Sequence, residues 1–337
     1  VGDVLHATLH HLDQVPAEGR AHRRADFARL KRVHRALELG HGVARVEPAE
    51  IAAAGGGEVG RARLGELAEV GAIDHALADP AQARLGIVVG EDLGGLDEDM
   101  AIYVQEHLIK NKVQVITSGN VVAIKDNKVL LEDGRAINAE LVLISAGVKP
   151  NTDLAVKAGV ELGITKSIKV NKKMMTNVPD IFACGDCIEE YNLVTGKSIY
   201  RPLGSTANKT GRIAGDAITG GDLEFRGILG TGIFQIFHMT VAQTGLSERE
   251  ARSEGYDVVT CHNIKPNKPE YMGGKEMVIK GIANKKDGRL LGVQIFGGEG
   301  VDKRIDVFAT AITYGAKVDD LFHLDLAYAP PFSTTKD

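Results

Sequence analysis

Residues 176–186, TNVPDIFACGD, decide the fold of this chain. They predict a short apolar strand at 181–183 that runs into a tight turn at Gly185 and ends on the acid Asp186. Glycine lets the backbone approach a ligand closely, because a side chain at that position would block the approach. Asp186 would then stand at the carboxyl end of a strand, which is where α/β sheets bind their ligands.

Two further stretches, one on each side, extend this reading. Residues 141–151, LVLISAGVKPN, predict a buried strand that is followed by a glycine turn. Residues 202–208, PLGSTAN, predict the start of a helix with Ser205 or Thr206 as its cap. A helix start presents free N–H groups and a partial positive charge, which suits the electron-rich edge of a ligand.

Together, the three stretches resemble the FAD-dependent pyridine nucleotide-disulfide oxidoreductases. In that family the counterpart of 176–186 is the second flavin-binding motif, and the acid matching Asp186 bonds the ribityl chain of FAD. The counterpart of 146–151 marks the chain's return from the NAD domain to the FAD domain. The resemblance implies FAD and NAD(P)H as cofactors, held through a set of cofactor-binding residues: Gly147, Pro150, Gly185, Asp186, Ala207 and Asn208.

Upstream of these motifs, the element order resembles the carboxyl half of the family's nucleotide-binding domain. A helix is expected from about residue 97 to 111, with Ile102, Val104 and His107 or Leu108 buried. A strand at 113–116 and a three-stranded meander at 121–124, 128–131 and 137–138 should follow, with turns at Asp126-Asn127 and Asp133-Gly134.

Residues 225–337 predict a separate α+β unit. Segments 276–282 and 290–296 look like hairpin partners, and a helix should span 301–314. The unit resembles the dimerisation domain of the same family, and its ending resembles that of the coenzyme A-disulfide reductase, NADH oxidase and persulfide reductase subgroup. The resemblance implies a homodimer in which Tyr328 acts as a catalytic residue in the partner's active site.

Composition limits the class of protein. The chain has 337 residues, a net charge of −5 and three cysteines without a framework spacing. The charge argues against a nucleic-acid partner, and no apolar run is long enough for a membrane span. No signal peptide is visible, and the cysteine usage is typical of a reducing compartment, so a cytoplasmic location is expected.

A break in composition near residue 85 divides the chain. Residues 1–84 hold ten arginines, one lysine and a single aromatic residue, Phe27, and they lack strand patterns. The expected fold class is α/β, with partial doubly wound nucleotide-binding domains followed by an α+β dimerisation domain. The predicted divisions are an unassigned, poorly packed segment 1–84, a partial NAD(P)-binding domain 85–148, the carboxyl part of an FAD-binding domain 149–222, and the dimerisation domain 223–337.

Two motifs within the first segment have weak support. Residues 55–60, GGGEVG, fit a dinucleotide-binding pattern, but no clear strand precedes them. His6, His10 and His11 have a spacing that could hold a metal on a helix, although exposed, non-binding histidines are the simpler interpretation. No metal site is therefore predicted.

The cysteines also leave alternatives. Cys184 and Cys187 form a C-x-x-C around the Gly185 turn, which fits either a redox pair or two small residues packed beside FAD; the second is favoured. Cys261 is expected to be inert, between a strand and a polar loop. None of the three stands where the family keeps its redox cysteine, and no first glycine-rich loop can be placed.

The function implied by the resemblance is electron transfer from NAD(P)H through FAD to a small-molecule disulfide or persulfide. NADH oxidase, with oxygen as acceptor, is the alternative within the enzyme class, and a non-catalytic dimerising remnant is the alternative of another class. Because composition and motifs fail at the same place, a truncated or frame-disrupted product is favoured over a fusion or a replaced start. Weak or absent FAD binding follows as an expectation.

Overall fold

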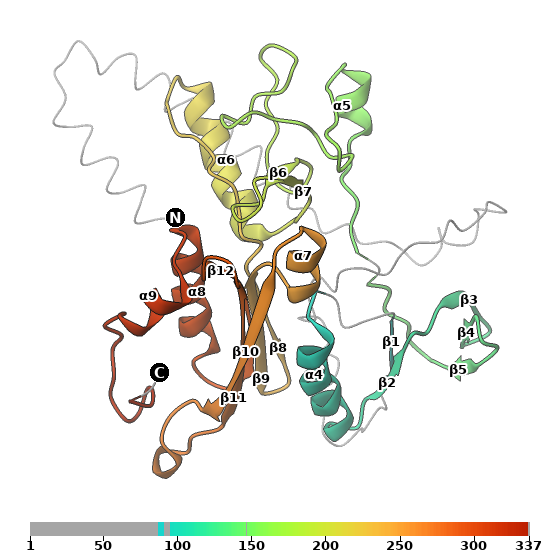
Figure 1. Cartoon of the computed structure of the whole chain (residues 1–337). Coiled ribbons are helices and arrows are strands. Elements are labelled where there is room, and N and C mark those ends of the chain that lie inside the picture. Colours follow the sequence, from blue (N-terminus) through green and yellow to red (C-terminus); the bar gives the residue numbers. More distant parts are fainter. Residues whose placement is uncertain (1–86, 91–94, 146, 336–337) are drawn as a thin grey trace, which may run out of the picture. The chain divides into compact units, whose positions relative to one another are not determined.

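The computed structural model describes residues 87–90, 95–145 and 147–335 (Figure 1). The segment 1–84, its glycine-rich stretch 55–60 and the histidines near its start lie outside the described residues. In the described part of the chain, no helix is long and apolar enough to cross a membrane.

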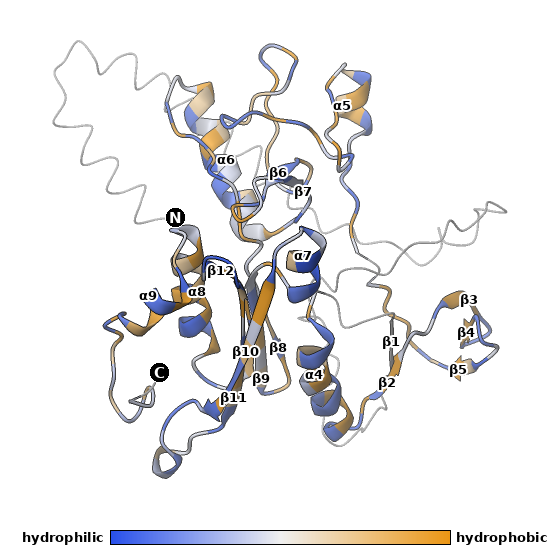
Figure 2. Cartoon of the chain, viewed as in Figure 1, coloured by the Kyte–Doolittle hydropathy of each residue, from blue (hydrophilic) through white to orange (hydrophobic). Residues whose placement is uncertain are grey.

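The first described elements form a β-α-β unit. Strand β1 (Ile87–Gly90) pairs in parallel with β2 (Gln114–Thr117), and helix α4 (Glu98–Lys110) connects them. The helix was expected, but its buried face is not the predicted one: Met100 is buried, whereas Ile102 is 52% exposed. Ile102 lies two residues from Met100 and from Val104, so it points to the opposite side of the helix. Helix α4 therefore shows both hydrophilic (blue) and hydrophobic (orange) residues in Figure 2.

The predicted meander is confirmed. Its strands are β3 (Val121–Lys125), β4 (Lys128–Leu131) and β5 (Ala136–Asn138), in the order β3-β4-β5. Asp126 and Asn127 both have positive φ, the conformation that two-residue hairpin turns need.

Two predicted strands are wrong in the form in which they were expected. Residues 141–145 are not a buried strand, since Leu141 is 80% exposed and Ile144 is 71% exposed. Residues 181–183 form only a single bridge, between Phe182 and Met175. A strand needs neighbours to complete its ladder of hydrogen bonds. Among the described residues, no strand pairs with 141–145, and 181–183 has only this single bridge.

The middle segment contains short elements around one helix. These are α5 (Asp153–Lys157), the small hairpin of β6 (Glu190–Tyr191) and β7 (Ser198–Ile199), and α6 (Gly204–Ile218). A buried apolar cluster joins α6 to the loops around the Gly185 turn. Its members include Ile168, Met174, Ile188, Ile213, Ala214 and Phe225.

The last third of the chain is the predicted α+β unit. It is a five-stranded antiparallel sheet in the order β10-β11-β12-β9-β8. The strands are β8 (Gly232–Ile236), β9 (Met239–Gly245), β10 (Val258–Pro266), β11 (Glu276–Asn284) and β12 (Leu290–Gly297). Its helices are α7 (Glu248–Ser253), α8 (Val301–Thr313) and α9 (Val318–Phe322), with a 3-10 turn at Glu270–Met272.

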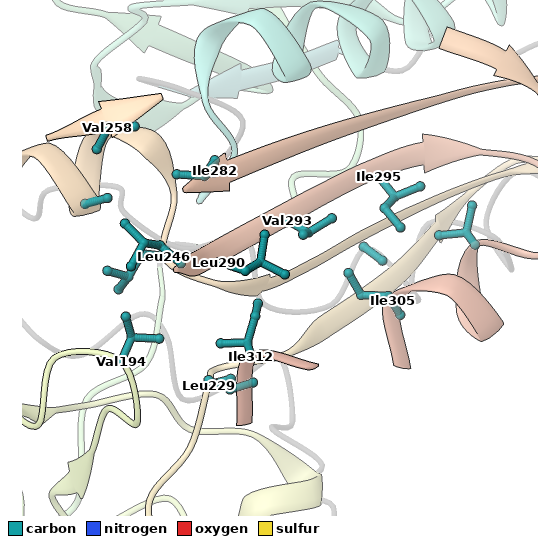
Figure 3. Close-up of a cluster of buried hydrophobic side chains, with 14 of the residues drawn as sticks. Val194, Leu229, Leu246, Val258, Ile282, Leu290, Val293, Ile295, Ile305 and Ile312 are labelled. Atoms are coloured by element: carbon teal, nitrogen blue, oxygen red, sulfur yellow. The ribbon is translucent and has the colours of Figure 1, made fainter. Parts of the chain in front are cut away.

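Helices cover both faces of this sheet. Val293 and Ile295 of β12 point to the face covered by α8, where they join the largest apolar cluster (Figure 3). Phe296 points to the other face and packs with Met100 and Val104 of α4. This alternation is the period of two that a strand imposes on its side chains. Helix α4, which was expected within a separate nucleotide-binding domain, thus covers one face of the sheet, and the predicted domain boundaries stay predictions.

Candidate functional site

The turn at Gly185 is built as the sequence suggested. Gly185 has φ +79°, a left-handed conformation that other residues rarely adopt. Its N–H donates to the hydroxyl oxygen of Thr210, at 3.0 Å. A Cβ atom at residue 185 would lie 3.7 Å from the Cβ of Ala207. Gly185 and Ala207, 22 positions apart in the sequence, are therefore neighbours in the structure.

Thr210 connects the turn to α6, and sequence reasoning missed it. The side chain is completely buried, and its hydroxyl donates to the carbonyl oxygen of Thr206, at 2.9 Å, while it accepts the N–H of Gly185. The hydroxyl therefore uses its hydrogen and a lone pair to hold two segments together. The available signal was the spacing of Thr206 and Thr210 on the apolar stripe of α6.

The N-terminus of α6 is open. The helix begins at Gly204 with Leu203 as its N-cap, and no side chain caps it, so the prediction that Ser205 or Thr206 is the cap is wrong. Leu203 is extended, which places the start of the helix before both hydroxyl residues. The N–H of Ala207 bonds to the carbonyl oxygen of Leu203, at 2.9 Å. Among the described residues, the preceding three N–H groups have no acceptor, so they can serve a ligand.

Asp186 and Asn208 present exposed polar side chains at this junction. Neither side chain makes a hydrogen bond or ion pair with the described residues. Asp186 directly follows the Gly185 turn, and Asn208 directly follows Ala207. These exposed side chains, together with the free N–H groups at the start of α6, are therefore available to bind a polar ligand.

The other predicted site residues are not joined to this junction. Gly147 has φ +76°, as a glycine turn requires, and Pro150 follows it in the same loop. Tyr328 is 50% exposed in the segment after α9. That segment folds back at Ala329, whose carbonyl oxygen accepts the N–H of Phe332 at 2.9 Å. No hydrogen bond or β-bridge of the described residues links these positions to the Gly185 turn.

Glu190 stands out behind the junction. The residue is 3% exposed, and its Oε2 is the one buried side-chain nitrogen or oxygen atom of the described residues that lacks a hydrogen-bond partner. Burial raises the pKa of Glu190 to about 8; the backbone N–H and the positive charge of Arg201 oppose the shift, and the negative charge of Asp186 adds to it. The carboxyl is therefore mostly protonated at neutral pH.

The thiols of the C-x-x-C are half-buried and free. Burial raises the pKa of both Cys184 and Cys187, and the thiol of Cys187 donates to the carbonyl oxygen of Cys184, at 3.4 Å. A raised pKa leaves little thiolate at neutral pH, and the thiolate is the reactive form. The geometry favours two packed residues over a redox pair. Cys261 is exposed within β10 and not between a strand and a loop as expected, because the strand continues to Pro266.

In the part of the chain that the structure describes, no group of three or more histidine, cysteine or acidic side chains could hold a metal ion. The features that remain are a glycine–acid turn held against an open helix start, and a helix-covered antiparallel sheet.

The chain belongs to the pyridine nucleotide-disulphide oxidoreductase family. The family model matches residues 14–200, and the model of the family's dimerisation domain matches residues 233–337. The first match begins at residue 14 and so includes most of segment 1–84, in which no resemblance was expected. This family uses FAD and NAD(P)H.

Three relatives illustrate the match. The chain is 44% identical over 209 residues to an "NAD(P)H sulfur oxidoreductase (CoA-dependent)" of Pyrococcus furiosus. The matched residues make up 62% of this chain and 47% of the relative. It is 35% identical to an "NADH oxidase" of Methanocaldococcus jannaschii, over 71% of this chain and 54% of the relative. A solved NAD-dependent persulfide reductase from A. fulgidus superimposes with a TM-score of 0.72 at 39% identity, over 74% of this chain and 48% of that one. The chain spans about half the length of the relatives it matches.

Proposed function

We propose that this chain supplies the flavin-side half of an FAD site in an enzyme that passes electrons from NAD(P)H to a disulfide or persulfide. The observation that carries the proposal is the junction of the Gly185 turn with the start of α6. Asp186 would accept hydrogen bonds from the ribityl hydroxyls, and the free N–H groups next to Ala207 and Asn208 would face the flavin's pyrimidine edge. Gly147 and Pro150 would lie where the chain passes between the two cofactor domains.

The residues fit such a group. Gly185 leaves space that a side chain would fill, the helix start has no competing cap, and the Asp186 carboxylate has no other partner among the described residues. When bound, FAD supplies the two-electron chemistry. The chain's own contribution is to orient the cofactor and to stabilise negative charge at the helix start. We also propose a cytoplasmic location, because free cysteines are typical of a reducing compartment.

The test is Asp186→Asn, which keeps the size of the side chain and removes its charge. A hydrogen bond to a charged group contributes about 1.5–3 kcal/mol, so the FAD dissociation constant should rise roughly 10- to 100-fold. Asp180→Asn is the matched control, because Asp180 is an exposed acid of the same loop. Flavin absorbance near 450 nm after equilibrium dialysis gives the measurement. Equal binding by the two variants would contradict the assignment of Asp186.

Two candidate activities differ in the electron acceptor that the enzyme uses. Sulfur, persulfide and disulfide acceptors are favoured by the names of the Pyrococcus and A. fulgidus relatives, whereas oxygen is favoured by that of the Methanocaldococcus relative. Oxygen uptake and thiol release, measured side by side with NADH and then NADPH, distinguish them. A colourless protein that only dimerises would support the non-catalytic alternative.

A homodimer is part of the proposal. The segment from α8 onward exposes large apolar side chains, among them Tyr314 at 80%, Phe322 at 87% and Phe332 at 69%. Such side chains are commonly covered by a partner subunit. In an isologous pairing, Tyr328 would reach the partner's flavin site and donate its O–H there. Sedimentation of the whole chain tests this: Phe322→Asp should give monomers, while Leu154→Asp, at a side chain of α5 that is 82% exposed, should not.

A further inference from the structure

Strand β10 lies at one edge of the five-stranded sheet, and β11 is its one neighbour there among the described residues. Before the strand, the carbonyl oxygen of Asp257 accepts the N–H of Lys285, at 2.6 Å. After the strand, the N–H of Asn267 donates to the carbonyl oxygen of Lys275, at 2.9 Å. Antiparallel strands bond to a given neighbour at every second residue, so the odd-numbered residues of β10 bond to β11. The even-numbered residues therefore direct their N–H and C=O groups outward.

The outward edge is free over a defined length. The even-numbered residues of the range 258–264 contribute four N–H and four C=O groups, and in the part of the chain that the structure describes no hydrogen bond reaches these groups. Pro266 takes the next outward position and ends the edge, because proline has no N–H to donate. An unpaired edge with free backbone groups is a template on which another strand can pair.

This edge is complementary to a second copy of itself. Two copies of β10 related by a two-fold axis pair in antiparallel fashion, and an axis through residue 261 is the one register that uses every outward residue of 258–264. Residue 258 then lies opposite 264, and residue 260 lies opposite 262. Any other register leaves outward groups of this range without a partner or places them against Pro266 or the segment before the strand.

The charges at the two ends of the edge agree with this register. It places Asp257 of one copy opposite Lys265 of the other, and the two-fold axis repeats the pair. Both residues are exposed, and neither forms an ion pair with the described residues. Opposite charges that face each other across antiparallel strands stabilise the pairing, and like charges destabilise it.

We propose that the β10 edge is a self-association surface, at which two copies of the chain join their five-stranded sheets into one, with Cys261 on the two-fold axis. The contact is separate from the apolar surface that begins at α8, and it does not depend on the FAD site. Two different two-fold contacts on one chain produce tetramers. The β10 contact would therefore pair the proposed dimers.

The first test uses Cys261 as a reporter in the full chain. In this register the two Cys261 residues are directly opposite and form a non-hydrogen-bonded pair, with Cα atoms roughly 4.5 Å apart, a distance that a disulfide can span. Diamide takes two electrons and two protons from the two thiols and should give a covalent dimer on a non-reducing gel. Cys261→Ser should give none, although it keeps Cys184 and Cys187.

A second cysteine variant tests the register itself. In Cys261→Ser with Asn263→Cys, the new thiol lies opposite Val259 of the other copy. It is then roughly 13 Å along the strand from the other copy's new thiol, which is too far for a disulfide. This variant should therefore stay monomeric on the gel. Cross-linking as strong as that of the wild type would refute the proposed register.

The charge pairs are tested by sedimentation equilibrium. An interface of this size is weak, so samples run from about 1 μM to about 300 μM. Lys265→Asp creates two like-charge pairs and should raise the dissociation constant of the association step at least about tenfold. Adding Asp257→Lys restores opposite charges and should return the constant to within about twofold of wild type. Lys286→Asp, the same charge change in the turn between β11 and β12, should have no effect.

The outcomes are distinguishable. Recovery in the charge-swapped double variant supports the contact and shows that Lys265→Asp still folds. Absence of a Cys261 cross-link together with absence of an association step, or equal effects of Lys265→Asp and Lys286→Asp, overturns self-association and leaves the edge to a strand of another protein. The step is from dimer to tetramer if the dimer proposed above exists and from monomer to dimer if it does not, so the two proposals fail independently.

Discussion

Replacing Lys280 with methionine should lower the free energy of unfolding by about 3–5 kcal/mol, the usual cost of removing one partner from a buried ion pair. The Lys280 side chain is 1% exposed, and its Nζ lies 3.1 Å from Asp97 and 2.8 Å from both Asp99 and Glu248. Burial alone would lower the pKa of Lys280, but its hydrogen bonds with Asp99 and Glu248 outweigh burial and raise it. Lys280 therefore stays charged and holds α4 and α7 to strand β11.

Methionine matches the length of lysine and keeps the packing, so the loss reports charge rather than volume. The variant leaves Asp97, 8% exposed, without its countercharge, although the N–H groups of Glu248 and Arg249 still bond to it at 2.9 and 3.2 Å. Adding Asp97→Asn to Lys280→Met should recover about 1–3 kcal/mol, because the uncompensated buried charge is then gone.

Urea denaturation followed by circular dichroism gives the measurement. The control is Lys110→Met, since the exposed pair of Lys110 with Glu106 should contribute less than about 0.5 kcal/mol. Although burial opposes it, Lys280 lowers the pKa of Asp99, and its hydrogen bond also lowers that of Glu248. The stabilisation is thus fully present above the ordinary glutamate value of 4.5 and is lost as the pH falls through the lowered values. A loss below 1 kcal/mol at pH 7, or one that does not shrink in acid, would refute the reasoning.

Three further outcomes are expected. Thr210→Val should cost about 1–3 kcal/mol because the partly buried N–H of Gly185 loses its acceptor, whereas Thr210→Ser should be close to wild type in urea denaturation. Ser247→Ala should cost about 1 kcal/mol through loss of the capping box at the start of α7; unchanged thermal unfolding would contradict this role. Cys184 and Cys187 should react slowly with a thiol reagent at pH 7 because burial raises the pKa of each thiol, and rapid modification would revive the redox-pair interpretation.

Sequence reasoning succeeded where a rule acts over a few residues. Gly185 and the Asp126-Asn127 turn both have the positive φ that their residue types allow. Helix α4 begins at Glu98, and its first turn holds the acids from which its start was predicted. It failed where the outcome depends on a distant partner. The run at 141–145 has the composition of a buried strand, yet it is exposed because no neighbouring strand pairs with it among the described residues.

The candidate site divides in the same way. Gly185 and Asp186 could be selected from sequence because a glycine turn that ends on an acid has a local physical reason, and Ala207 could be selected because its segment resembles the family's pattern. That Thr210 ties the turn to the helix could not be predicted, since its hydroxyl finds Gly185 only after the loop has folded back.

The sequence by itself determined the turns, the helix α4 and the antiparallel hairpin of β11 and β12, because φ preferences and side-chain periodicity are properties of neighbouring residues. Only the tertiary structure decided which charges are buried. Lys280 lies two positions after the buried Val278 on the same face of β11, and Glu190 follows another glutamate at the start of β6. Neither pattern reveals which residues are buried or paired, because burial and pairing depend on segments up to 181 residues away that meet only when the chain has packed.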